Sequence, residues 1–363
     1  MKRFFAGTAA ALLAAVLLFP VRSNAVSARR AVMLDAITGR FLYEKDPNER
    51  SLIASTTKIM TALVVCERCN VLDRMRIPKE AVGIEGSSMY LREGEVLTIQ
   101  ELLYGLMLSS GNDAAVALAI YCGGTVEGFA QLMNDKAHVL GLKGTHFENP
   151  NGLDSPEHFS TAGDLAVLAA YAMENPIFYK TVSAKTVTVG DRYLRNHNKL
   201  LWQVEGADGV KTGYTKAAGR ILVSSATREE RRLVAVTLDD PDDWRDHAAL
   251  LEEGFSKYSV KQIISEGDLI ETVDVLGGTR GEVQILASED FSYALAPEEN
   301  IQWMIPGPGF VYAPAAEGAS AGYAYALLQG NVIGKIKVQF GQTVEQSGTK
   351  EKGYLYRIFG DWK

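Results

Sequence analysis

Cysteine and histidine are scarce in this 363-residue sequence, which limits the redox and metal-binding sites that it can form. The three cysteines are Cys66, Cys69 and Cys122, and five histidines accompany them. Cys66 and Cys69 have the spacing of a redox motif, but they come late in a helical run and not at a helix start after a strand. Two cysteines without a second pair or a nearby histidine make a poor zinc site, and the histidines show no HExxH-like spacing. We therefore expect no metal and no cofactor.

An excess of basic residues is also missing. The chain has 37 Lys and Arg residues against 44 Asp and Glu. Three of the basic residues and none of the acidic ones lie in the first 25 positions, so the remainder has 34 against 44 and a formal charge of −10. Because nucleic-acid binding favours a basic surface, we expect no nucleic-acid partner.

The apolar run at the N-terminus is too short to be typical of a membrane-spanning helix, which needs roughly 20 apolar residues. Lys2 and Arg3 precede this run, and the small residues Ser23 and Ala25 suit cleavage after position 25. Residues 1–25 are therefore predicted to be a secretory signal peptide, with a retained membrane anchor as the alternative. The protein is accordingly expected to be exported.

Two patterns divide the rest of the chain. Residues 26–258 combine a strand hairpin near the start, several runs of helical periodicity, short β-branched strands after Gly209 and a closing helix. Residues 260–346 show alternating strands with glycine-rich turns and no long helix. The sequence therefore predicts an α/β (α+β) domain with an antiparallel sheet and a helical subdomain, followed by a small all-β domain.

Three short motifs occur in order: STTK at 55–58, SGN at 110–112 and KTG at 211–213. Each has an ordinary structural explanation by itself, as a helix cap, a turn, or a strand edge protected by a lysine. Their joint occurrence in an exported chain favours one shared site.

The first motif pairs a nucleophile with a base. Ser55 and Lys58, three residues apart on a helix, project from the same face. A serine hydroxyl becomes nucleophilic when a base takes its proton, and a lysine can act as that base only when neutral. Burial lowers a lysine pKa, and the neighbouring cation Lys211 would lower the pKa of Lys58 further.

The other two motifs supply groups for the substrate. A strand carrying the KTG motif can run beside an extended peptide, and Gly213 lets the two backbones approach closely. The N–H groups of Ser55 and Tyr214 are then the expected oxyanion donors. Ser110 can relay a proton to the leaving amine, and the Asn112 amide can orient Lys58 and the substrate.

At these residues the sequence resembles the penicillin-recognising serine peptidases, in particular the low-molecular-mass D-alanyl-D-alanine carboxypeptidases. ASTTKIMTALVV, LMLSSGNDAAVALA and NHNKLLWQVEGADGVKTGYT all look like that family, and the resemblance extends over roughly 31–340. It implies a penicillin-binding domain followed by an all-β domain that holds it above the membrane. It also implies roles for single residues: Ser55 as acylated nucleophile, Lys58 as general base, Ser110 as proton relay supported by Asn112, Lys211 and Thr212 as ligands of the substrate carboxylate, and Arg245 as added positive charge.

This resemblance implies a hydrolase that removes the terminal D-alanine from peptidoglycan stem pentapeptides and is covalently inhibited by β-lactams. A class A β-lactamase would need a glutamate to activate the deacylating water, and no E-x-x-L-N segment lies between Asn112 and Lys211. A catalytically silent wall-binding protein is a further alternative. In the tail, 347–363, apolar residues fall on one helical face among basic ones, which predicts either a membrane-surface helix or docking on the β domain.

Overall fold

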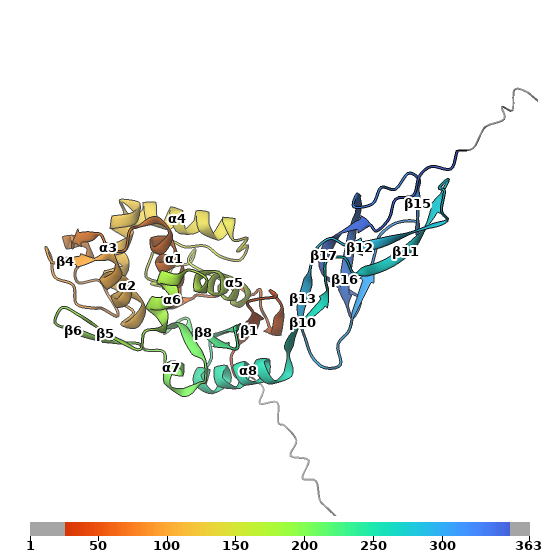
Figure 1. Cartoon of the computed structure of the whole chain (residues 1–363). Helices are drawn as coiled ribbons and strands as arrows, with labels where there is room; N and C mark the ends of the chain where they lie inside the picture. Colours follow the sequence, from red (N-terminus) through yellow and green to blue (C-terminus); the bar gives the residue numbers. More distant parts are fainter. Residues whose placement is uncertain (1–25, 349–363) are drawn as a thin grey trace, which may run out of the picture.

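The computed structural model describes residues 26–348, which form two parts joined near residue 258 (Figure 1). The signal peptide predicted over 1–25 and nearly all of the predicted tail lie outside the described residues. The first part mixes helices and strands, and the second consists of strands. The predicted fold class, an α+β domain followed by an all-β domain, is confirmed.

The first part is built from a central sheet and helices on both of its faces. In chain order its elements are β1 (Arg30–Asp35), β2 (Phe41–Lys45), η1 (Ala54–Thr57), α1 (Lys58–Arg68), β3 (Arg74–Arg76), η2 (Lys79–Ala81), β4 (Val96–Thr98), α2 (Ile99–Leu108), α3 (Asn112–Gly123), α4 (Val126–Val139), α5 (Ala162–Met173), α6 (Pro176–Ser183), β5 (Thr186–Val189), β6 (Arg192–Arg195), α7 (Leu200–Gln203), β7 (Ala207–Thr215), β8 (Gly219–Arg228), β9 (Arg231–Leu238) and α8 (Asp243–Lys257).

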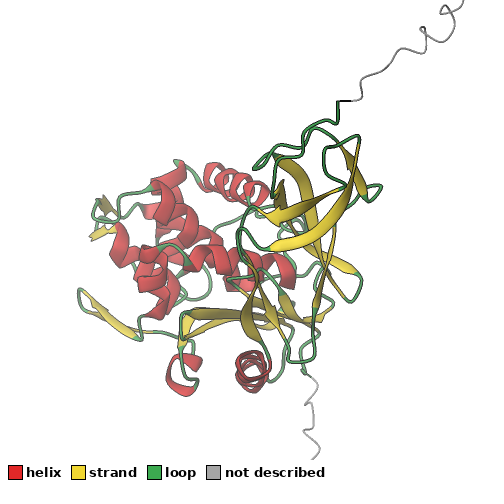
Figure 2. Cartoon of the chain, turned by 45° about the vertical axis from the view of Figure 1, so that its right-hand side comes forward, coloured by secondary structure: helices red, strands yellow, loops and turns green. Residues whose placement is uncertain are grey.

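The central sheet is antiparallel, with the strand order β2-β1-β9-β8-β7. Figure 2 shows α8 on one face of this sheet and the larger group of helices on the other. Because side chains alternate along a strand, β1 contributes to both layers. Val32 and Leu34 belong to the main core beneath the helices, whereas Ala31 and Met33 pack with Leu250 of α8. This arrangement leaves β7 at the edge of the sheet, where its outer side is free to meet other segments.

One run of helical periodicity in the sequence extends over 98–121, but the structure divides it into α2 and α3. Ser110 has φ 58°, in the left-handed region that most residues avoid. The backbone finds other partners at this break, since Gly111 N–H donates to the Gly105 carbonyl at 3.1 Å and Asn112 N–H to the Ser87 carbonyl at 2.7 Å. The SGN motif therefore forms a turn and a new helix start.

The second part is an independent β structure with its own apolar core. Six strands form one sheet in the order β14-β16-β17-β12-β11-β15, and a two-stranded ribbon pairs β10 with β13. The elements are β10 (Ser259–Ile264), β11 (Leu269–Leu276), β12 (Glu282–Ala287), β13 (Phe291–Leu295), β14 (Ile301–Met304), β15 (Phe310–Tyr312), β16 (Ser320–Leu328) and β17 (Asn331–Phe340).

A side-chain cluster at the base of the β part fastens it to the first part. The guanidinium of Arg40 binds both carboxylate oxygens of Glu299, at 2.6 and 2.7 Å, and donates to the Ala294 carbonyl at 2.6 Å. It also lies over the rings of Tyr258 and Tyr293, with its carbon 5.2 and 5.4 Å from their centres. One arginine thus links the β1–β2 turn to two segments of the β part.

No single helix within residues 26–348 is both long and apolar enough to cross a membrane; α3 and α4, bent by 82° where they meet, satisfy those length and composition criteria only as a pair.

Candidate active site

Ser55 and Lys58 lie at the junction of η1 and α1. Ser55 occupies the 3-10 turn, and Lys58 is the first residue of the α-helix proper. Ala54, immediately before the serine, has φ 44° and is buried. A non-glycine residue at positive φ costs free energy, which other contacts of the fold must offset. The tight turn directs the Ser55 hydroxyl toward the Lys58 amine, with the two atoms 2.8 Å apart.

The Lys58 amine has three polar neighbours. Besides Ser55 Oγ, they are Asn112 Oδ1 at 2.7 Å and the Asn151 carbonyl oxygen at 2.6 Å. Neither of these two oxygens can donate a hydrogen bond, so a neutral amine that donates to both has its lone pair left for the Ser55 hydroxyl proton. Three separate chain segments therefore fix the Lys58 amine in a geometry that suits a general base.

Burial shifts the pKa values of both motif lysines downward. Lys58 is fully buried, and its desolvation, followed by the positive charge of Lys211, holds its pKa well below the usual lysine value; Asp113 opposes the shift. Lys211 is 1% exposed, and burial lowers its pKa to about 7. Taking an ammonium out of water disfavours its charged form, so Lys58 is the lysine poised to be neutral.

The SGN turn is held by the segment that precedes α2. Asn112 donates from Nδ2 to the Glu85 carbonyl at 2.5 Å while its Oδ1 accepts from Lys58. The buried Asp113 carboxylate accepts from the Ser88 hydroxyl at 2.6 Å and from the N–H groups of Met89 and Leu91 at 3.0 Å. The Asn112 amide is therefore held at both its oxygen and its nitrogen, and the neighbouring Asp113 fixes the turn.

The loop that supplies the Asn151 carbonyl packs closely against the serine turn. Gly152 has φ +86°, and a Cβ there would lie 1.8 Å from the Ala54 carbonyl oxygen, so only glycine fits. Within the same loop His158 is buried, which lowers its pKa to about 4, and its Nδ1 accepts from the Glu148 N–H at 3.1 Å. The neutral ring consequently donates from Nε2 to Thr57 Oγ1, 2.7 Å away.

Strand β7 brings the KTG motif to the serine turn. A Cβ on Gly213 would lie 3.3 Å from the Ser55 nitrogen and from the Ala54 Cβ, so the absence of a side chain permits this approach. Lys211 is buried and donates from Nζ to the Thr212 carbonyl at 2.9 Å. Tyr214 is 65% exposed, beyond the point of closest approach.

A cavity of about 320 Å³ joins these groups. Its lining residues are Ser55, Ser87, Ser110, His197, Thr212, Gly213, Tyr214, Arg220, Ile221, Asp243 and Trp244. The structure thus brings together both motif serines and the KTG strand, with the Lys58 amine behind Ser55. A larger hollow of about 880 Å³, which includes Glu205 and Phe255, contains no motif residue.

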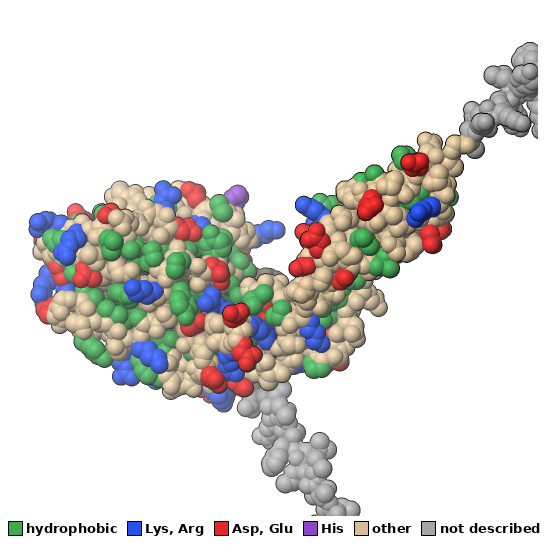
Figure 3. Space-filling model, in the orientation of Figure 1, with side chains coloured by type: hydrophobic (Ala, Val, Ile, Leu, Met, Phe, Trp, Pro, Cys, Tyr) green, Lys and Arg blue, Asp and Glu red, His purple; other side chains and the backbone are tan. Residues whose placement is uncertain are grey.

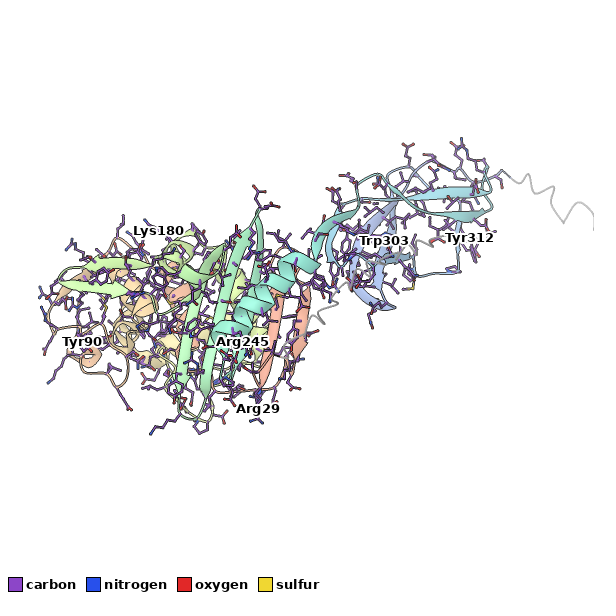
Figure 4. The ribbon with its side chains drawn as sticks, turned by 90° about the horizontal axis from the view of Figure 1, so that it is seen from below. Arg29, Tyr90, Lys180, Arg245, Trp303 and Tyr312 are labelled. Carbon is purple, nitrogen blue, oxygen red and sulfur yellow. The ribbon has the colours of Figure 1, made fainter. Side chains whose placement is uncertain are left out.

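Arg245 is not among the cavity-lining residues. It lies on α8 (Figure 4). Its guanidinium pairs with Asp242 at 3.0 Å and with Asp246 at 3.3 Å. The arginine that lines the cavity is Arg220 of β8, which donates to the buried Asp243 at 2.6 Å. The expectation that Arg245 adds positive charge for the substrate is therefore not supported by its position.

Two further residues of the site, His197 and Asn151, were not predicted from the sequence. Burial, with the nearby charge of Lys211, lowers the pKa of His197. The only signal for His197 was its place in the resembling NHNKLLW segment, and a backbone carbonyl such as that of Asn151 leaves no side-chain signal. Among the described residues, no group of three or more His, Cys, Asp or Glu side chains is arranged to hold a metal ion.

A serine hydroxyl in contact with a buried lysine amine, above a glycine-bearing edge strand, defines a serine hydrolase of the Ser–Lys class. The family model described as D-alanyl-D-alanine carboxypeptidase matches residues 19–242, and that of the penicillin-binding protein 5 C-terminal domain matches 258–346. The chain belongs to the D-alanyl-D-alanine carboxypeptidase family, and it is a serine-type D-Ala-D-Ala carboxypeptidase.

Individual relatives agree over nearly the whole length. The D-alanyl-D-alanine carboxypeptidase DacF of Bacillus subtilis is 32% identical, over 92% of this chain and 90% of the relative. DacC of Escherichia coli is 32% identical, over 93% and 88%. The crystal structure of penicillin binding protein 5 from Haemophilus influenzae superposes with a TM-score of 0.75 at 30% identity, over 88% of this chain and 98% of that one.

Proposed function

We propose that Ser55 attacks the carbonyl of the terminal D-Ala-D-Ala bond of a peptidoglycan stem pentapeptide, with Lys58 as its general base. The observation that carries this proposal is the Lys58 amine, which has two fixed acceptors and the Ser55 hydroxyl around it. The neutral amine takes the serine proton as the Oγ–carbon bond forms. The resulting ammonium is met by the Asn112 and Asn151 oxygens, which stabilise the charge that develops.

The backbone N–H groups of Ser55 and Tyr214 donate hydrogen bonds to the substrate carbonyl oxygen and stabilise the negative charge that develops on it. Gly213 lies close to the Ser55 nitrogen, and this supports the assignment. The N–H of Ser55 and that of Tyr214, the residue after Gly213, come from these two neighbouring segments and can donate to the same substrate oxygen. The edge position of β7 leaves room for an extended peptide to pair beside it.

The remaining roles concern the leaving group and the terminal carboxylate. Ser110 lines the cavity with Ser55 and relays the proton from Lys58 to the departing D-alanine amine. Lys211 and Thr212 bind the carboxylate of that residue, and Arg220 replaces Arg245 as the additional cation in the cavity. A bound carboxylate would favour the charged form of Lys211, whose pKa lies near 7 in its absence.

A second step hydrolyses the acyl-serine. Of the described residues that line the cavity, the one carboxylate is Asp243, which is already paired with Arg220. A class A β-lactamase uses a glutamate to activate the deacylating water, and this cavity offers no comparable free carboxylate. We therefore expect a β-lactam acyl group to remain on Ser55 far longer than it does on the serine of a class A β-lactamase.

Mass spectrometry can test both steps in one protein. The mature chain is mixed with a stem pentapeptide to follow D-alanine release, and separately with penicillin to follow the mass of the covalent adduct and its site by peptide mapping. An adduct at Ser55 that persists, together with D-alanine release, supports the proposal. Rapid turnover of penicillin without D-alanine release would favour a β-lactamase, and neither reaction would favour a silent binding protein.

We also propose that the protein acts outside the cytoplasm, held at the membrane surface by its tail. The predicted signal peptide and the apolar stripe with its basic neighbours in 347–363 support this, although both lie outside the described residues. Flotation with anionic liposomes tests the tail. Deleting Gly353 to Lys363 should release the protein without changing turnover of soluble substrate, whereas a full-length mature chain that never floats would contradict a membrane role.

A further inference from the structure

The two helices that carry the catalytic motifs are matched in length and joined at their first residues. Lys58 starts α1 and Asn112 starts α3, and their side chains are hydrogen-bonded at 2.7 Å. Cys69 lies eleven residues after Lys58, and Cys122 ten residues after Asn112. At about 1.5 Å per residue, both cysteines come roughly 15–17 Å from the joined ends. Because α1 and α3 lie in contact, the two cysteines come at a similar distance along the helix pair.

The contacts at that far end agree with this placement. The thiols of Cys69 and Cys122 interact closely enough that each shifts the pKa of the other, and both side chains are half-buried against the edge of the main core. Tyr121, next to Cys122, donates to the Asp73 carboxylate at 2.9 Å and so ties the end of α3 to the loop after α1.

We propose that Cys69 and Cys122 form a disulfide when the exported protein meets a disulfide oxidant, such as oxidised glutathione or an extracytoplasmic thiol oxidoreductase. The bond would join the C-terminal ends of α1 and α3, at the opposite end from the Lys58–Asn112 hydrogen bond. The inference is independent of the reaction proposed for Ser55.

The environment gives the two thiols different parts in the exchange. The interaction with Cys69 and the positive charge of Arg68 lower the pKa of Cys122, whereas the interaction with Cys122 and burial raise the pKa of Cys69. The Cys122 thiolate attacks one sulfur of the oxidant and releases the other as a thiolate, leaving a mixed disulfide. Cys69 then attacks Cys122 Sγ, its proton passing to solvent, and the second oxidant thiolate departs. Two thiols and one oxidant disulfide give one protein disulfide and two small thiols.

Cys66 does not take part, although it shares a CxxC spacing with Cys69. It lies inside α1 and is buried, and burial raises its pKa to about 12. Cys66 therefore serves as the matched internal control.

The tryptic map separates the possible pairings. Cleavage after Arg68 puts Cys66 in 59–68 and Cys69 in 69–74, while Cys122 falls in 93–136. The mature protein is treated with oxidised glutathione, its remaining thiols are alkylated under denaturing conditions, and it is digested without reduction. We expect a linked 69–74/93–136 peptide and alkylation of Cys66 alone.

Thermal unfolding supplies a second readout. The cross-link closes a loop of more than fifty residues in the unfolded chain, so oxidation should raise the Tm of wild type by roughly 5 °C or more. Cys66→Ser should keep both the linked peptide and the Tm difference, whereas Cys69→Ser and Cys122→Ser should lose both. Three alkylated thiols after oxidation, a stable glutathione adduct on Cys122, or a link that includes 59–68 would each overturn the proposal.

Discussion

The two parts of the molecule differ in what they bury. In the α+β part, lysines, aspartates, histidines and asparagines are enclosed, including Lys58, Lys211, Asp113 and His247. Within the described portion of the β part, 259–348, every side chain in the buried set is apolar apart from the Tyr293 hydroxyl. Both parts carry interspersed acidic and basic side chains on the face seen in Figure 3. The difference therefore lies in the interiors and not in the visible surface.

Burying a polar or charged group costs free energy unless it is hydrogen-bonded. In the α+β part most of these groups have hydrogen-bond partners: His247, for example, is held between Ser224 and Thr237, at 2.6 and 2.9 Å. Such networks fix a site in place. The β part instead packs around apolar residues, with Trp303 against Phe291, and so has the interior of a scaffold. The comparison predicts that substitutions in the two parts affect different observables.

The largest effect is expected for Ser55→Ala, which removes the nucleophile and leaves the surrounding contacts of Lys58 to Asn112 and Asn151 in place. Acylation by penicillin and D-alanine release should both fall by about 10⁴-fold or more. Stopped-flow acylation and a D-alanine assay measure this, and circular dichroism shows whether the variant is folded. Retained labelling in a folded Ser55→Ala protein would refute the assignment of the nucleophile.

Lys211→Ala should cost roughly 10²-fold in kcat/KM, because a buried cation that binds the substrate carboxylate is lost. The pKa of Lys58 is lowered first by burial and then by Lys211, so removing that charge raises the Lys58 pKa. Activity requires neutral Lys58, and the acidic limb of the kcat/KM profile should therefore move to higher pH. Lys211→Arg, which keeps the charge, is the control. An unmoved acidic limb in Lys211→Ala would mean that the two lysines are not coupled.

Ile336→Ala tests the other part. Ile336 is 2% exposed in the β-part core, and truncating a buried isoleucine costs about 2–5 kcal/mol. Calorimetry should show a less stable β part, while the penicillin acylation rate at 25 °C stays within about twofold, since no residue of this core lines the cavity. Val332→Ala, at an exposed site on the same strand, is the matched control. A parallel loss of acylation would show that the two parts are not separable in function.

Whether a contact of this site could be predicted from the sequence depends on how many residues separate its two partners along the chain. Ser55 and Lys58 could be paired from their spacing alone, because one helical turn fixes their separation. Asn151 could not be found, because a loop about 90 residues away supplies a backbone carbonyl, and any residue has one. Arg245 was expected to add positive charge for the substrate, but its position on α8 directs its guanidinium to Asp242 and Asp246, and the arginine that lines the cavity is Arg220 of β8.

The helices and strands show the same dependence on separation along the chain. The hairpin of β1 and β2 and the helix α5 were predictable from turn residues and periodicity within short windows. The β5–β6 hairpin and α6 were not assigned, because their short runs of mixed residues gain most of their stability from packing against α2 and β7. Local signals thus predict elements, whereas tertiary contacts determine the shortest ones.

The smallest effect is expected at the junction, where Glu299→Gln removes one charge of the pair with Arg40. Arg40 keeps its bond to the Ala294 carbonyl, so we expect a loss of about 1–2 kcal/mol and no change in acylation. The hydrogen bond from Arg40 lowers the pKa of Glu299, so its stabilisation is present above the pKa of an unfolded glutamate, about 4.3, and is lost as pH falls further. Calorimetry at pH 7 and pH 3.5 should therefore show a wild-type advantage over Glu299→Gln that is smaller at pH 3.5 than at pH 7. Glu298→Gln, at an exposed neighbouring position, should show no such pH-dependent difference. An advantage that is equal at both pH values would mean that packing of Arg40 over Tyr258 and Tyr293, and not its ion pair, joins the two parts.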